Sequence, residues 1–381
     1  MTINNEHKKL NVPNLRFPEF QGEWKVESIK DVADFMGGGT PSSSNESFWQ
    51  GTIPWVSSSD IVENDIKNIS ISRYITEEAI AHSATKLCPA PSILIVSRVG
   101  VGKIALSKEA ICTSQDFCNL INIKVEPIFL TYCLSQIMKR KSMEVQGTSI
   151  KGITTSEIQK ISINIPSLQE QKKIGKILSL LDERIATQNK IIEDLKKLKC
   201  AIAERLFKVT NGEVVALSGV CNIQKGKQVN GDCLSETGTY YVMNGGTEPS
   251  GYYEQCNAPA DTISISEGGN SCGYIQYNRD AFWSGGHCYT LTDIQSNVCN
   301  LYLYHYLKSK ESTIMKLRIG TGLPNIQKKD LEKFAVLLPP VAKQVRISTF
   351  LTAIERKTTN EEILLSHFQE EKQYLLRQMF I

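Results

Sequence analysis

Long apolar runs are missing from this 381-residue sequence, and no stretch approaches the roughly 18 apolar residues of a membrane-spanning helix. The first residues, MTINNEHKKLNVPN, lack the apolar centre of a secretory signal. There are 11 cysteines but no Cys-x-x-Cys pair and only 5 histidines, so the spacing of a structural zinc site is absent. We therefore expect a cytoplasmic protein with buried, reduced cysteines, no bound metal and no membrane contact.

Catalytic motifs are missing as well. An amino-methyltransferase that flips a base would carry Asn/Asp-Pro-Pro-aromatic, whereas the only Pro-Pro, Pro339-Pro340, lies in LLPPVAK. The segment SRVGVGKIA at 97–105 approximates a phosphate loop, but Ser97 and Ile104 stand where that motif requires glycine and Ser/Thr. A strand, a glycine turn and a second strand are the better interpretation. The sequence predicts no catalytic residue and no cofactor.

Net charge is small, at +3 for the whole chain. Residues 1–150 carry a net charge of −1 and residues 211–318 carry −3, whereas residues 151–210 carry +5. A protein that held DNA mainly by neutralising phosphates would be more basic in its large domains. If this chain binds DNA, its partners must supply much of the positive charge.

The chain contains an internal repeat. Residues 147–207 align with residues 320–380 at a constant offset of 173 without a gap, and the identities include Ile153/Ile326, Pro166/Pro339 and Gln171/Gln344. Two looser correspondences precede it: VESIKDVADFMGG at 26–38 with VVALSGVCNIQKG at 214–226, and SILIVSRVGVGKIAL at 92–106 with DTISISEGGNSCGYI at 261–275, with one residue inserted. Variable and shared blocks alternate, which predicts two related domains.

Short β-branched runs between glycine turns predict many short strands in the variable blocks, with helices near 127–144 and 298–316. Each shared block ends in a long helix, and Ser167 with Glu170 predicts a capping box at the start of the first. Seam positions spaced alternately by four and three residues suit a coiled coil. They are 174, 178, 181, 185, 188, 192, 195, 199, 202 and 206, and the same positions plus 173. Packing of each helix on its own domain is the alternative.

The polar seam positions suggest a register. Gln188 and Lys199 interrupt the first seam, and Thr358, Glu361 and Lys372 interrupt the second. If the two helices pair antiparallel about a pseudo-two-fold axis, one position of that axis along the helices places Lys199 opposite Glu361 and also Gln188 opposite Lys372. The predicted fold is mixed α/β, with two globular α/β domains joined by two long antiparallel helices and an internal pseudo-two-fold repeat.

Several motifs resemble the specificity (S) subunits of type I restriction-modification systems. They are PNLRFPEFQGEWK at 13–25, GGGTPSSSNESFWQGTIPWVSSSDI at 37–61, SRVGVGK at 97–103, and GTSIKGIT at 147–154 followed by INIPSLQEQKKIGKIL at 163–178. The resemblance covers essentially the whole chain. Two features depart from it: Lys343 stands where the first copy has Glu170, and the second variable block has no GGGTPS loop.

The resemblance implies target-recognition domains at 1–150 and 211–322, and conserved regions with a spacer helix at 151–210 and 323–381. It implies a non-catalytic subunit that recognises a bipartite site on double-stranded DNA. It also implies docking of two methyltransferase (M) subunits and, through them, restriction (R) subunits, with S-adenosylmethionine, ATP and Mg on the partners only. The alternative is a coiled-coil protein–protein adaptor without nucleic-acid binding, which the duplication alone permits.

Base-reading residues are sought among basic, amide and hydroxyl side chains in loops that flank glycines. In the first half these are Ser97, Arg98, Lys103, Gln115, Thr148 and Lys151. In the second half they are Lys225, Lys227, Gln228, Asn270, Thr321 and Asn325. An ordinary turn or surface role is the competing interpretation for each of them.

Overall fold

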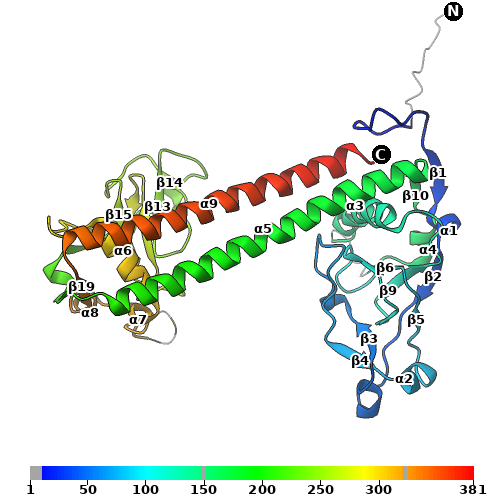
Figure 1. Cartoon of the computed structure of the whole chain (residues 1–381), viewed down its shortest axis with the longest axis horizontal. Helices are drawn as coiled ribbons and strands as arrows, with labels where there is room; N and C mark the ends of the chain where they lie inside the picture. Colours follow the sequence, from blue (N-terminus) through cyan, green and yellow to red (C-terminus); the bar gives the residue numbers. More distant parts are fainter. Residues whose placement is uncertain (1–10, 147–151, 321, 323) are drawn as a thin grey trace, which may run out of the picture. The chain divides into compact units, whose positions relative to one another are not determined.

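The computed structural model describes residues 11–146, 152–320, 322 and 324–381. The chain folds into two compact units. Unit 1 comprises residues up to Thr187 together with Leu365–Ile381, and unit 2 comprises Gln188–Leu364. Figure 1 labels the elements of each unit. The domain boundaries at 150, 210 and 322 stay predictions, because the border between the two units crosses the two long helices instead.

Unit 1 contains two four-stranded sheets, ordered β2-β9-β6-β7 and β4-β3-β8-β5, and the separate antiparallel pair β1-β10. Its strands are β1 (Lys25–Ser28), β2 (Asp34–Gly37), β3 (Ile53–Val56), β4 (Arg73–Ile75), β5 (Leu87–Cys88), β6 (Ser92–Val96), β7 (Ile104–Ser107), β8 (Ile111–Thr113), β9 (Phe117–Ile121) and β10 (Ser162–Ile165). Its short helices are α1 (Ile29–Val32), η1 (Glu46–Trp49), η2 (Ser58–Asp60), α2 (Glu77–Ala81) and α4 (Thr155–Gln159), and its long helix within the variable block is α3 (Pro127–Gln146).

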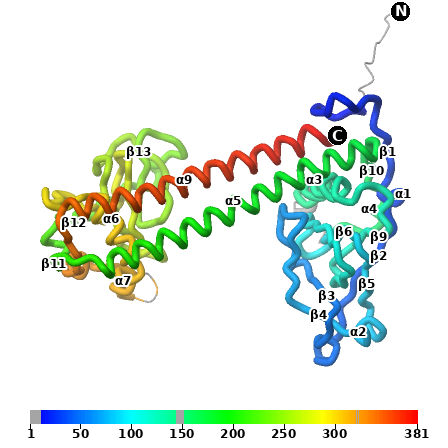
Figure 2. Tube along the Cα trace, viewed as in Figure 1, coloured from blue at the N-terminus to red at the C-terminus, as the bar shows by residue number. Residues whose placement is uncertain are grey.

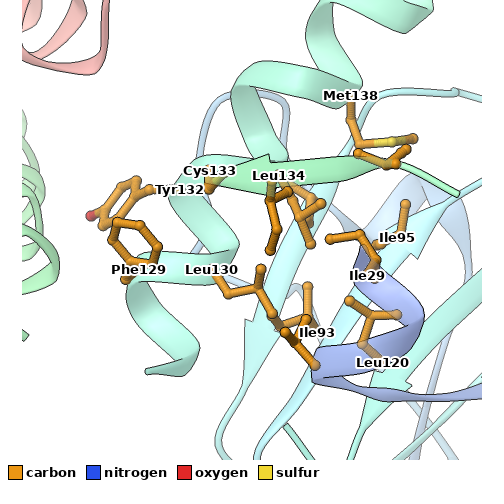
Figure 3. Close-up of a cluster of buried hydrophobic side chains, with 14 of the residues drawn as sticks. Ile29, Ile93, Ile95, Leu120, Phe129, Leu130, Tyr132, Cys133, Leu134 and Met138 are labelled. Carbon is orange, nitrogen blue, oxygen red and sulfur yellow. The ribbon is translucent and has the colours of Figure 1, made fainter. Parts of the chain in front are cut away.

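The core of unit 1 lies between α3 and the β2-β9-β6-β7 sheet. Every residue of β6 and β9 is buried, so neither strand shows the alternation of a half-exposed strand. Figure 3 shows Leu130 and Leu134 of α3 beside Ile93 and Leu120 of the sheet. Each fully buried Leu or Ile contributes about 1.5–3 kcal/mol relative to exposure.

Unit 2 repeats this plan with a four-stranded sheet ordered β12-β18-β15-β16, a three-stranded sheet β14-β13-β17 and the pair β11-β19. Its strands are β11 (Glu213–Ala216), β12 (Asn222–Lys225), β13 (Tyr240–Met243), β14 (Tyr252–Tyr253), β15 (Thr262–Ser266), β16 (Ile275–Asn278), β17 (Trp283–Ser284), β18 (Cys288–Thr292) and β19 (Ala335–Leu338). Its shorter helices are η3 (Leu217–Gly219), η4 (Gly231–Cys233), α6 (Asn300–Ser309), α7 (Glu311–Met315) and α8 (Lys328–Glu332).

The sequence correspondences are confirmed element by element. The strands β1 and β2 match β11 and β12, and β10 matches β19 at the offset of 173. The hairpin β6-β7 matches β15-β16, and the one inserted residue that the alignment requires lies in the turn of the second hairpin. The helices expected near 127–144 and 298–316 are α3 and the pair α6-α7.

The two long helices are α5 (Leu168–Val209) and α9 (Val341–Gln378). All 20 predicted seam positions are buried or partly buried, including Gln188, Glu361 and Lys372 at 2%, 8% and 8% exposure. Within each unit the helices run antiparallel: in unit 2, Gln188 contacts Glu361 and Lys199 contacts Glu355. Figure 2 traces α5 and α9 in each unit. The mixed α/β fold with a repeat is confirmed.

The predicted partners across the seam are wrong. Lys199 pairs with Glu355, with 2.6 Å between Nζ and Oε1, and Gln188 donates to Glu361. Lys372 pairs with Asp182, with 2.5 Å between Nζ and Oδ1. The two ion pairs are related by the repeat, since Asp182 and Lys199 correspond to Glu355 and Lys372. Asp182 and Glu355 lie one position after a seam residue, and the long lysine side chains reach them.

Two glutamines hold the start of each long helix against the variable block. Gln171 is 3% exposed; its Nε2 donates to the Pro166 carbonyl at 2.9 Å, and its Oε1 accepts the backbone N–H of Glu126 at 2.9 Å. Gln344 makes the same two contacts, with the Pro339 carbonyl and with the N–H of Cys299. The shared Pro…Gln spacing therefore builds a joint between α5 and α3, and between α9 and α6.

The capping box predicted at the start of α5 is only half present. The Ser167 hydroxyl accepts the Glu170 N–H at 3.3 Å, as predicted. The Glu170 carboxylate turns instead to Arg16, which donates from Nε and Nη2 at 2.8 Å each, and to Trp24 Nε1. A bidentate arginine is a stronger partner than one backbone N–H, so the carboxylate, 1% exposed, stays with Arg16.

Candidate nucleic-acid interface

Three loops meet at one end of the main sheet in unit 1. Because β2, β9, β6 and β7 are antiparallel neighbours, the ends of β2 and β6 and the starts of β9 and β7 lie at the same sheet end. Residues 38–40, 97–103 and 114–116 therefore gather there, and we name this set edge 1. The N–H of Ile153 donates to the Ser97 carbonyl at 2.7 Å, which brings the shared block to edge 1.

The described residues predicted to read bases in the first half all lie on edge 1, but they are not equally accessible. Arg98 and Gln115 are exposed, and Gln115 accepts a hydrogen bond from the Thr40 hydroxyl at 2.5 Å. Lys103 is partly buried and donates to the Ser58 carbonyl at 3.3 Å. Ser97 is 7% exposed and its hydroxyl donates to the Asp116 carbonyl, which is a structural role. Thr148 and Lys151 lie outside the described residues.

The second unit has the same arrangement. The ends of β12 and β15 and the starts of β18 and β16 meet, so residues 226–228, 267–274 and 285–287 gather at one sheet end, named edge 2. The N–H of Ile326 donates to the Glu267 carbonyl at 2.8 Å, which repeats the contact of Ile153 with Ser97. Lys225, the last residue of β12, adjoins edge 2.

Most predicted residues of the second half are exposed at this edge. Lys225, Lys227, Gln228, Asn270 and Asn325 are all exposed. Trp283 donates from Nε1 to the carbonyl of Lys227 at 2.7 Å, and Gln228 donates to the carbonyl of Val229 at 3.2 Å, so the backbone of this loop is held. The β-bridge between Gly268 and Asn325 places this part of the second shared block at edge 2. Thr321 lies outside the described residues.

A buried carboxylate organises edge 2. Glu267 is 8% exposed; its Oε1 is 2.6 Å from Lys225 Nζ and accepts the Tyr289 hydroxyl at 3.0 Å. Burial and this hydrogen bond raise the pKa of the Tyr289 hydroxyl well above its usual range, so it remains a donor. His287 Nδ1 lies 3.7 Å from Glu267 Oε2. The edge therefore presents Lys225 and His287 around a fixed negative charge.

Glycines allow the loops of both edges to approach closely. A Cβ on Gly38 would lie 2.0 Å from the Ser114 carbonyl oxygen, and one on Gly226 would lie 2.2 Å from that of Gly285. Gly38 and Gly226 correspond in the repeat, so the duplication preserved this contact. The sequence-based search missed Thr40, Asn244 and His287, which lie among these loops. The Gly285-Gly286-His287 run before β18 was the signal available for His287.

Other classes of site have no support in the described part of the chain. No group of three or more His, Cys, Asp or Glu side chains that could hold a metal ion occurs among the described residues. No described helix is long and apolar enough to cross a membrane. All 11 cysteines are free; Cys200, Cys233 and Cys256 are exposed, so the expectation that the thiols are buried fails for these three. Burial raises the pKa of Cys133 to about 12.

Comparison with known proteins agrees with the repeat. The sequence model described as "Type I restriction modification DNA specificity domain" matches residues 21–197 and 210–366. The type I restriction enzyme MjaIX specificity subunit of Methanocaldococcus jannaschii is 34% identical over 193 residues, or 49% of this chain and 43% of that protein. The EcoR124I/EcoR124II specificity subunit of Escherichia coli is 34% identical over 193 residues, or 48% and 46%. The chain spans less than half the length of these two relatives.

A solved structure covers more of the chain. The type I restriction-modification system S subunit from M. genitalium aligns with a TM-score of 0.68 at 20% identity and covers 97% of this chain and 99% of that one. At this identity the likeness concerns the fold. Since the family model accounts for most of the sequence in two segments, the chain belongs to the type I restriction modification DNA specificity domain family, with two copies of that domain.

Proposed function

We propose that this chain is the DNA-specificity subunit of a type I restriction-modification complex and recognises a bipartite site, with one half-site for each edge. The observation that carries the proposal is the repetition of the loop edge. Two related sheets each gather exposed basic and amide side chains at the same end, over backbones fixed by close glycine contacts. Side chains of this chemistry read base edges and phosphates.

The divergence between the edges supports recognition of unlike half-sites. Edge 1 presents Arg98 and Gln115, whereas edge 2 presents Lys227, and Lys225 and His287 beside Glu267. Direct readout depends on which donors and acceptors face the major groove. Two edges with different donors and acceptors would therefore select different bases.

The proposed partners are two methyltransferase subunits and, through them, restriction subunits, in a cytoplasmic complex. S-adenosylmethionine, ATP and Mg would belong to those partners, and this chain would contribute no catalytic group. The weak net charge of the variable blocks supports the need for partners, because phosphate neutralisation by this chain alone would be modest. The competing function, an adaptor without nucleic-acid binding, would leave the repeated loop edges without a role.

Methylome sequencing tests the proposal. In a host that carries the partner genes, deletion of this gene should abolish methylation at one bipartite motif. Replacement of residues 1–145 by the first half of another family member should change one half-site and leave the other. A change in both half-sites would contradict independent reading by the two units, and unchanged methylation in the deletion strain would reject the function.

Single substitutions place the reading residues more sharply. Arg98→Ala and Lys227→Ala should each weaken DNA binding by the assembled complex and relax the preference in one half-site only. Ser97→Ala is the matched control, because Ser97 is buried on the same edge and donates only to a backbone carbonyl. If Ser97→Ala alters the half-site as strongly as Arg98→Ala, edge 1 acts through its fold and not through direct contact.

A further inference from the structure

An open groove lies along the free edge of the main sheet in unit 2. Its volume is about 660 Å³, and it is bounded by the edge strand β16, by α6, and by the parts of α5 and α9 that belong to this unit. Five cationic side chains line it, against two carboxylates. The cations are Lys196, Lys199, Arg279, Lys308 and Arg356, and the carboxylates are Glu355 and Glu362.

The two carboxylates of the groove are already paired. Glu355 accepts from Lys199 at 2.6 Å and from the Tyr304 hydroxyl at 2.9 Å. Glu362 lies 2.7 Å from Lys196. Among the residues that the structure describes, Arg279 and Arg356 have no ion-pair partner, and both are exposed. The Asp261 carboxylate lies beside these arginines and accepts the Tyr277 hydroxyl at 3.1 Å. With two arginines against this one carboxylate, the groove keeps a net positive charge and favours an anionic ligand.

The strand edge in the groove also offers backbone groups. The N–H of Ile275 donates to Glu311, and its carbonyl accepts from Lys308 at 2.9 Å, so both backbone groups of Ile275 face away from β15. Along an antiparallel strand, every second residue directs its N–H and carbonyl away from the neighbouring strand. Tyr277 is two residues after Ile275, so its N–H and carbonyl also face away from β15, into the groove. Outside the pairing of β16 with β15, no backbone acceptor within the described residues bonds the Tyr277 N–H. Such an edge is a template for another strand.

Unit 1 shows what occupies the corresponding edge. Leu106 of β7 corresponds to Tyr277, and its N–H donates to the Ile66 carbonyl at 2.8 Å. Beside it, Lys67 Nζ donates to the Ser179 carbonyl and pairs with Glu183 of α5, both at 2.9 Å. A polypeptide loop thus covers this edge and leaves a cavity of about 280 Å³.

The repeat reverses the charge at the contact with the long helix. Glu183, which binds the lysine of the loop in unit 1, corresponds to Arg356 in unit 2 at the offset of 173. We propose that the unit 2 groove binds an extended acidic segment of a partner protein, which adds to β16 as a strand and places carboxylates on Arg279 and Arg356. This mode of recognition combines main-chain hydrogen bonds with side-chain specificity. It does not depend on the DNA-reading role of the edges.

A polypeptide suits the groove better than a DNA backbone. Phosphates supply acceptors only, so they would leave the outward carbonyl of Tyr277 without a donor, whereas a strand satisfies both groups. The occupant of the repeat-related edge in unit 1 is also a polypeptide. Competition with DNA is therefore one of the outcomes that the experiment must distinguish.

The probe is a fluorescein-labelled peptide, Val-Glu-Asn-Asp-Ile-Glu-Asn, which copies residues 62–68 with Lys67→Glu. Anisotropy titration with the full chain should give saturable binding with a Kd on the order of 10⁻⁴ M. The peptide with the native lysine should bind about tenfold more weakly, since its ammonium would meet Arg356. The Arg279→Glu/Arg356→Glu variant should lose about tenfold or more, and the bound peptide should slow hydrogen exchange at Tyr277.

The control variant is Lys108→Glu. Lys108 corresponds to Arg279 in unit 1, where the loop already covers the edge, so peptide affinity should not change. Absence of saturable binding up to about 1 mM peptide, or equal binding by the arginine variant, overturns the proposal. Displacement of the peptide by a short DNA duplex overturns it as well and assigns the groove to phosphates. Because both arginines are exposed, their substitution should leave the fold intact. Methylome readouts are independent of this test.

Discussion

The Lys372→Met substitution should destabilise unit 1 because it leaves the Asp182 carboxylate buried without its cation. The two side chains are 10% and 13% exposed, and the remaining donor to Asp182 is the Tyr132 hydroxyl at 2.6 Å. Removal of one member of a buried ion pair typically costs about 3–5 kcal/mol. We expect about 3 kcal/mol, since Tyr132 keeps part of the carboxylate satisfied.

The repeat supplies a matched comparison. Lys199→Met changes the corresponding residue in unit 2, but there the lysine and its partner Glu355 are 20% and 28% exposed. Water can solvate the abandoned carboxylate more fully, so the expected loss is about 1–2 kcal/mol, between the values typical of exposed and buried pairs. Lys372→Met combined with Asp182→Leu should recover most of the stability lost in unit 1, because no unpaired charge remains.

Native-state hydrogen exchange measures the two units separately, through the amides of α3 for unit 1 and of α6 for unit 2. Lys197→Met is the control, since its ion pair with Glu193 is exposed and its removal should leave exchange unchanged. Equal losses from Lys372→Met and Lys199→Met, or a double variant no more stable than Lys372→Met alone, would refute the argument from burial.

Three further predictions concern single side chains. Burial lowers the pKa of His305 to about 4 and outweighs the opposing effect of Glu355. In the unfolded chain the imidazole of this residue binds a proton near its ordinary pKa of 6.5, whereas in the folded chain it stays neutral down to about pH 4. The wild type should therefore lose about 2 kcal/mol of unfolding free energy from pH 7 to pH 5, and His305→Gln should not lose it. Urea unfolding at both pH values measures the difference. Gln344→Ala should cost about 1–3 kcal/mol, seen as faster exchange at the start of α6, because the Cys299 N–H loses its acceptor. Arg16→Ala should lower the melting temperature more than Lys173→Ala, because Glu170 is 1% exposed whereas the ion pair of Lys173 with Glu19 lies at the surface.

The elements of the fold were predictable because repetition made each pattern appear twice. The constant offset of 173 placed β10 with β19, α4 with α8 and α5 with α9. The alignment also required one inserted residue, and the structure places it in the second hairpin turn. The seam positions were predictable for a simpler reason. A spacing of four and three residues determines which face of a helix is buried, whatever that face contacts.

The seam partners were not predictable by matching polar seam residues to each other. Lys199 and Lys372 carry long side chains that reach carboxylates flanking the seam, at positions that the seam pattern does not include. The role of Glu170 depends on Arg16, 154 residues away, and no local pattern contains that contact. Ser97 illustrates the same limit at edge 1, since only the fold shows that a hydroxyl in a glycine-rich turn is buried against Asp116.

The glutamine joint at the start of each long helix has a consequence for inheritance. Gln171 and Gln344 reach the variable blocks through the N–H groups of Glu126 and Cys299, and those two residues differ. A main-chain N–H donor is present in every residue except proline. A recombination event could therefore exchange one variable block for an unrelated sequence. The new block would still donate a main-chain N–H to the glutamine at the start of the long helix. Such a lineage could acquire a new half-site in one event, without intermediate mutations to refit the joint.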